Sequence, residues 1–83
     1  MGIETKLMPS WDKNCYRHDL VTSRKGGHYL VNTDFQPARG LWVTTVYRCD
    51  EQGIVSNWDE IDIDMGSAFV AMHDRMVDIW GTK

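Results

Sequence analysis

Three short loops, each containing glycine, divide the middle of the chain into runs of β-forming residues. They are RKGG at 24–27, QPARG at 36–40 and DEQG at 50–53. Parallel strands need a crossover of a dozen or more residues, whereas these loops suit tight turns. The loops therefore predict an antiparallel meander, in which each strand pairs with the next one along the chain.

The runs between the loops have the composition of strands. LWVTTVYRC at 41–49 is almost entirely β-branched or aromatic, as residues in sheets usually are. The strand-like runs are 15–23, 28–35, 41–49 and 54–65. We expect a four-stranded sheet over 15–65, preceded by an irregular lead-in at 1–14.

The C-terminal stretch has the period of an amphipathic helix. At 100° per residue, one face gathers Phe69, Met72, Met76, Ile79 and Trp80, widened by Val70 and Val77. Ser67 suits the N-cap and Gly81 the end of the helix. The expected fold class is α+β: a single domain over 1–83, with a four-stranded antiparallel meander and one C-terminal amphipathic helix at 67–80, packed on one sheet face.

An acidic run precedes this helix and forms a candidate functional stretch. Its carboxylates are Asp59, Glu60, Asp62 and Asp64. Ile61, Ile63 and Met65 alternate with the acids, which predicts a strand with an apolar buried face and an acidic face in water. A calcium loop is the alternative, but Gly66 stands at its third ligand position and His73 at its last.

His73 lies within the apolar arc of the expected helix and has two interpretations. It is either a half-buried structural histidine that bonds a strand carbonyl or a tyrosine hydroxyl, or a general base or ligand oriented by Asp74 or Asp78. Those acids project from the opposite face of the helix, which favours the structural interpretation.

The sequence predicts no metal and no cofactor. Cys15, His18, His28 and Cys49 are zinc-type residues, but their spacing fits no zinc module. On a strand, Cys15 and His18 also point to opposite faces. We expect two free thiols in a cytoplasmic protein, because no secretory signal or membrane-length apolar run is present.

The charge of the chain bears on its partners. A net charge of −3 makes nucleic-acid binding an unfavoured function, since that needs a basic footprint. The same acids raise the alternative of a nucleic-acid mimic that acts as an inhibitor, for which −3 is a small charge.

Apolar surface exceeds what one helix can cover. We expect Trp42, Val46 and Leu30 to lie on the sheet face away from the helix, as an interface. Trp11 is a further interface candidate, and in the alternative arrangement it folds back over that face with the rest of residues 1–14. The sequence thus predicts a protein that binds a protein partner or itself, with a homodimer as the simplest form.

The second half of the chain resembles small uncharacterised bacteriophage and prophage proteins. They have a strand, a hairpin, a polar strand and then a helix with A-x-x-x-H-x-x-M/W-V. The positions that match are Thr44, Thr45, Val46, Tyr47, Gly53, Ala68 or Ala71, His73, Met76 and Val77. Thr44 departs from the Glu common in that family, and Phe69 and Val70 depart from its Glu-Ala.

The resemblance implies a phage or mobile-element accessory protein in the host cytoplasm, and not an enzyme. With the apolar surface, this makes protein–protein binding the first functional hypothesis. A small-molecule-binding or hydrolytic domain that uses His73 and nearby acids is the second. An acidic mimic of nucleic acid is the third.

Overall fold

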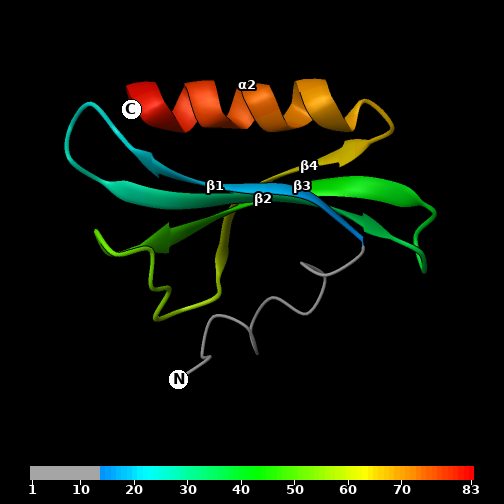
Figure 1. Ribbon diagram of the computed structural model, residues 1–83, viewed down its shortest axis with the longest axis horizontal. Helices are drawn as coiled ribbons and strands as arrows, with labels where there is room; N and C mark the ends of the chain where they lie inside the picture. The colour runs from blue at the N-terminus through cyan, green and yellow to red at the C-terminus, as the bar shows by residue number, and fades with distance from the viewer. Residues whose placement is uncertain (1–13) are drawn as a thin grey trace.

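The structure, a computed structural model, describes residues 14–83 and consists there of a sheet with a helix lying across one face (Figure 1). The elements are β1 (Cys15–Thr22), β2 (His28–Gln36), β3 (Leu41–Cys49), β4 (Glu60–Gly66) and α2 (Phe69–Thr82). All neighbouring strands are antiparallel, in the order β1-β2-β3-β4. The expected α+β meander with one C-terminal helix is confirmed.

Hydrogen bonds to the Asp50 side chain fix the conformation of the turn that follows β3. The carboxylate of Asp50 accepts hydrogen bonds of 2.9 Å from the backbone N–H groups of Gln52 and Ile54. Gly53 between them has a φ of +83°, a left-handed conformation that a residue with a Cβ adopts only at a cost. The chain then crosses beneath the sheet, on the side away from α2, before it returns as β4 (Figure 1).

The pairing of the strands decides which residues face the helix. Val31 of β2 lies opposite Val46 of β3, and together with Val21 these valines form a core against Met76 of α2. Leu30 lies opposite Tyr47 and belongs to the other face.

The expectation that Trp42 and Val46 face away from the helix is therefore wrong. The Trp42 ring stacks on Phe69 of α2 with 4.2 Å between ring centroids, and Val46 is fully buried beneath the helix. Leu30 does lie on the opposite face, but it is buried as well. Trp11, the remaining interface candidate, lies outside the described residues.

The ends of the helix also differ from expectation. Ala68, and not Ser67, occupies the N-cap position, and no side chain caps the first turn. The helix continues through Gly81, whose carbonyl accepts a 3.1 Å bond from the backbone N–H of Arg24. The β1–β2 turn thus satisfies one of the carbonyls that a helix end leaves unpaired. Val70, expected on the apolar face, is exposed.

Candidate functional site

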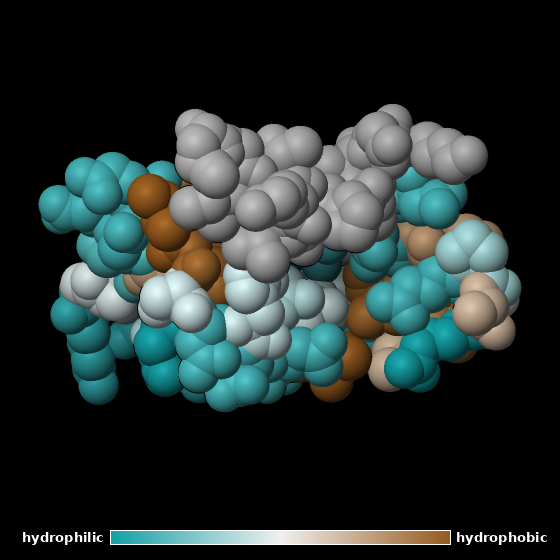
Figure 2. Space-filling model, turned by 90° about the horizontal axis from the view of Figure 1, so that it is seen from below, coloured by the Kyte–Doolittle hydropathy of each residue, from teal (hydrophilic) through white to brown (hydrophobic). Residues whose placement is uncertain are grey.

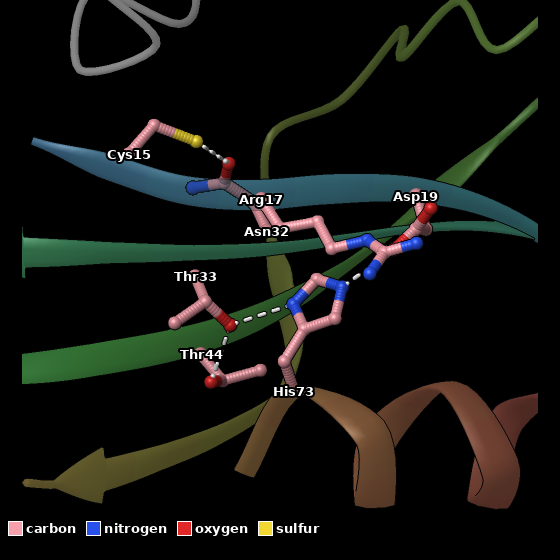
Figure 3. A network of polar contacts seen from close by, with 7 residues as sticks. All are labelled: Cys15, Arg17, Asp19, Asn32, Thr33, Thr44 and His73. Atoms are coloured by element: carbon pink, nitrogen blue, oxygen red, sulfur yellow. Dashed lines mark hydrogen bonds and ion pairs between the residues drawn. The ribbon is translucent and has the colours of Figure 1, made fainter. Parts of the chain in front are cut away.

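His73 is the polar centre of the interface between helix and sheet. Its side chain is fully buried, and each ring nitrogen has a partner from a different strand (Figure 3). Nδ1 lies 2.8 Å from the hydroxyl of Thr33 on β2. Nε2 lies 2.7 Å from the carboxylate of Asp19 on β1. The helical position of His73 thus joins two strands that are distant from it in the chain.

The hydrogen bonds of His73 continue in both directions to form a chain, which we call the polar chain: Arg17, Asp19, His73, Thr33 and Thr44. The Thr33 and Thr44 hydroxyls are 2.6 Å apart, and Arg17 Nε lies 2.9 Å from the same Asp19 oxygen that contacts His73. The register explains this continuity, because Arg17 lies opposite Thr33, and Thr33 opposite Thr44. A polar row therefore crosses three strands beneath the helix.

Two proton arrangements fit the contacts along the polar chain. In the first, a neutral imidazole donates from Nε2 to Asp19, and Thr33 donates to Nδ1 while accepting from Thr44. In the second, an imidazolium donates from both nitrogens, and Thr33 donates to Thr44. The first arrangement gives every hydrogen of His73, Thr33 and Thr44 an acceptor within the polar chain, as a native interior requires, whereas the second gives the buried Thr44 hydroxyl hydrogen none there.

The sequence of groups from carboxylate to imidazole to hydroxyl is that of a hydrolase triad. A nucleophilic hydroxyl must approach the substrate carbonyl to about 3 Å. Thr33 and His73 each have no exposed surface, and packed side chains surround them. The Tyr16 ring packs against the imidazole in a T-shaped arrangement, with 5.7 Å between the two ring centroids. The geometry therefore suits a fixed structural connection.

Sequence reasoning identified His73 but missed its partners. The two expected orienters, Asp74 and Asp78, lie on the exposed side of α2. The carboxylate that contacts His73 comes instead from Asp19, 54 positions earlier. One signal in the sequence could have indicated these partners. Strand alternation places Asp19 on the same face as Val21, and Thr33 on the same face as Val31 and Phe35. Polar residues in line with core residues need a partner across the interface.

Two of the three acids of β4, Asp62 and Asp64, contact the helix instead of pointing directly into water as expected. Asp62 lies opposite Val46 on the helix-facing side, and its Oδ2 accepts a 3.0 Å bond from the indole N–H of Trp80. Asp64 Oδ2 accepts a 2.7 Å bond from Arg75. The expected buried residues, Ile63 and Met65, are exposed on the opposite face.

A register shift in β4 causes this reversal. Tyr47 pairs with Glu60, but its neighbour Val46 pairs with Asp62. Ile61 is therefore an extra residue, and it packs against the core while Asp62 remains on the helix-facing side. A bulge of this kind exchanges the faces of all residues that follow it.

The second oxygens of the two aspartates close the outer edge of β4. Asp62 Oδ1 accepts from the backbone N–H of Ile63, and Asp64 Oδ1 from that of Met65, both at 2.9 Å. An outer strand otherwise presents such donors to any passing strand. We call this arrangement the capped edge. Each aspartate thus joins the helix to the sheet and blocks one edge donor.

The other two acids of the candidate stretch are separate from His73. Asp59 lines a hollow of about 360 Å³ in the β3–β4 connection, and Glu60 is exposed at the start of β4. Burial raises the pKa of Tyr47, and the charge of Glu60 raises it further. A second hollow, of about 430 Å³, lies beside the first turn of α2. The structure thus does not unite the five candidate functional residues into one site.

The two cysteines are free thiols. Cys15 Sγ is 3.5 Å from the side-chain oxygen of Asn32. Burial raises the pKa of Cys15, with a further contribution from Asp34, and burial and Asp50 raise the pKa of Cys49. Residues 14–83 contain no cluster of three or more His, Cys, Asp or Glu residues suited to holding a metal ion.

The sheet face away from the helix carries exposed apolar side chains at its margins. They are Leu20 (57% exposed), Ile63 (41%) and Met65 (41%) of the sheet and Ile54 (51%) of the β3–β4 connection, which lies on the same side. Figure 2 views this face and shows hydrophobic side chains gathered in two places on it. Leu30 and Val43, also on this face, are buried. We call the four exposed residues the apolar margin.

The chain matches no known protein family, no curated protein and no solved structure. Among residues 14–83, the one helix is too short and too polar to cross a lipid bilayer.

Proposed function

We propose that this chain is a small accessory interaction protein that binds another protein through the sheet face away from the helix. The observation that carries the proposal is the apolar margin: Leu20, Ile54, Ile63 and Met65 are exposed although α2 already covers the other face. Exposed apolar groups that gather on one face often mark protein-binding surfaces.

The same proposal assigns no catalysis to the chain. His73 and Thr33 have the chemistry of a hydrolytic site, but their complete burial supports a structural role over the hydrolytic alternative. The nucleic-acid mimic is also less favoured. Asp62 and Asp64 are engaged by Trp80, Arg75 and the backbone of β4, so they do not form a row of carboxylates directed into water.

The origin proposed for the chain, a phage or mobile element, rests on its resemblance to small phage proteins. In that setting the partner is a phage or host protein, and the compartment is the host cytoplasm. The binding proposal is independent of this origin, because it rests on the surface alone.

A photo-crosslinking residue at the apolar margin tests the proposal. Placed at Ile63 in the full chain and irradiated in the cells that encode it, it should give one discrete adduct with a protein. The control carries the same residue at Asp78, on the outer side of α2, and should give none. Equal adducts from both positions, or no adduct from Leu20, Ile54, Ile63 or Met65, would contradict the proposal.

A further inference from the structure

The two outer strands of the sheet, β1 and β4, differ in the backbone groups that their edges leave available for pairing with another strand. On β4 the N–H groups of Ile63 and Met65 are already taken by the capped edge. On β1, the Ser23 N–H donates 2.7 Å to Gly27 O, which sets the alternation of bonds along the hairpin. With this alternation, the backbone N–H and C=O groups of Val21 and Asp19 bond to β2, and those of Leu20 and Thr22 point away from the sheet. In the part of the chain that the structure describes, no side chain caps these two.

Charge separates the two edges further. If β4 paired with itself, Glu60, Asp62 and Asp64 would meet the same acids of a second copy, and like charges on facing strands are destabilising. The stretch from Arg17 to Thr22 of β1 has one positive and one negative charge, which already contact each other at 2.9 Å. Only β1 combines outward backbone groups with charge balance.

We infer that β1 is a self-association edge, which pairs antiparallel with β1 of a second copy and joins two sheets into one. The inference goes beyond the proposed function, because it places a second copy of the chain at the β1 edge and leaves Ile63 available to another protein. Leu20 supplies the apolar contact, because it is 57% exposed in the middle of the regular part of β1. The twofold axis passes between the two Leu20 residues, so each donates to and accepts from the other.

The register follows from the same features. A centre at Asp19 would set the Asp19 residues of the two copies directly opposite each other. A centre at His18 would draw the irregular step between Cys15 and Arg17 into the pairing. With Leu20 at the centre, Asp19 faces Val21 of the second copy, and every pair stays within the regular stretch. A short edge interface of this kind falls below about 1,000 Å² and is of the weak, reversible class.

Sedimentation velocity of the full chain is the first test, from about 10 μM to about 1 mM, where a weak dimer becomes populated. We expect a monomer–dimer equilibrium. Leu20→Lys should raise the dimer dissociation constant by about tenfold or more, because lysine on an edge strand opposes pairing. Ile63→Lys is the matched control, since Ile63 is an exposed apolar residue of the same face on the other edge. It should change the constant by less than about threefold.

A disulfide trap tests the register and does not depend on the stability of a charged variant. In a Cys15→Ser, Cys49→Ser background, Leu20→Cys should form a covalent dimer under mild oxidation, since hydrogen-bonded antiparallel pairs have Cα atoms about 5.5 Å apart. His18→Cys, on the same face and strand, and Ile63→Cys, on the other edge, should form it at least about tenfold more slowly.

The outcomes separate this inference from the proposed function. A monomer at every concentration, a dimer lost equally in Ile63→Lys, or faster trapping at position 18 or 63 than at 20 overturns the β1 dimer. If the crosslinker at Ile63 still captures a different protein, the proposed binding function stands without self-association. If no adduct and no dimer form, both are wrong.

Discussion

The imidazole of His73 lies 2.7 Å from the carboxylate of Asp19, although 54 positions separate the two residues. The contact joins the edge strand β1 to the only helix of the described residues, within an interface that is otherwise mainly apolar. A buried polar group must meet its partner, so it tolerates far fewer rotations and shifts of the helix than an apolar surface does. The polar chain therefore sets the position of α2 on the sheet.

Replacing His73 with leucine keeps the volume but removes both bonds. We expect His73→Leu to lower the free energy of unfolding by about 1–3 kcal/mol, measured by urea denaturation. Asp74→Ala, on the exposed side of the same turn, should change it by less than about 0.5 kcal/mol. A His73→Leu variant as stable as the parent would show that packing alone positions the helix.

The two threonines of the polar chain form a matched pair, since both are fully buried and valine has nearly the shape of threonine. Thr33→Val removes the central hydroxyl and leaves both His73 Nδ1 and Thr44 without their partner. Thr44→Val removes only the terminal one. Thr33→Val should therefore cost about 1–2 kcal/mol more than Thr44→Val in urea denaturation. If both variants lost the same free energy of unfolding, Thr33 would not connect His73 to Thr44 in one continuous hydrogen-bonded chain.

Trp42 should behave as a core residue. Trp42→Ser removes the stack on Phe69 and should lower the free energy of unfolding by about 2–4 kcal/mol. Val70→Ser, at an exposed position next to Phe69, should change it by less than about 0.5 kcal/mol. Circular dichroism melting curves measure both. If Trp42→Ser stayed as stable as the parent and changed only self-association, Trp42 would be a surface residue and not part of the core.

The capped edge makes a local prediction for amide hydrogen exchange. Asp62→Ala should speed the exchange of the Ile63 amide by about threefold to tenfold, because its acceptor is lost. Asp64→Ala should do the same for Met65. Each variant is the control for the other, since the amide of the second site should change little. Uniform acceleration in both would indicate general loosening of β4 instead.

Alkaline pH should weaken the fold. The pKa values of Cys15, Cys49 and Tyr47 are all raised, mainly by burial, above ordinary values of 9.0, 9.0 and 10.0. The folded state then holds protons that the unfolded state releases, so this stability is complete below pH 9 and is lost as the pH rises through the raised values. The urea midpoint should fall from pH 8 to pH 11, and Tyr47→Phe should flatten the fall above pH 10. An unchanged slope in Tyr47→Phe would contradict the assignment to Tyr47.

The meander and the helix could be predicted from sequence because short loops and periodic patterns are local signals. The assignment of side chains to the two faces of the sheet was wrong because one loop was predicted one residue too long. The expected loop 36–40 places Leu30 opposite Val46, on one face. In the structure β2 includes Gln36, the loop is one residue shorter, and Leu30 lies opposite Tyr47 instead. Because side chains alternate with period two, one residue is enough to exchange the faces.

The candidate site shows the same limit for contacts between distant residues. His73 could be recognised as buried and polar from its place on the helical wheel. Asp19 could not be assigned to it, because the register of β1 and the docking angle of α2 both enter that contact. The bulge at Ile61 was equally unpredictable, and with it the inward direction of Asp62.

The contact between Asp19 and His73 also bears on the order of folding during synthesis. The hairpins of β1, β2 and β3 involve near neighbours in the chain, so they can form while later residues are still being added. Asp19 and Thr33 meet their imidazole only after the helix has been made. Asp19 and Thr33 of a nascent sheet therefore stay exposed to water until the later-synthesised α2 packs on them and buries them.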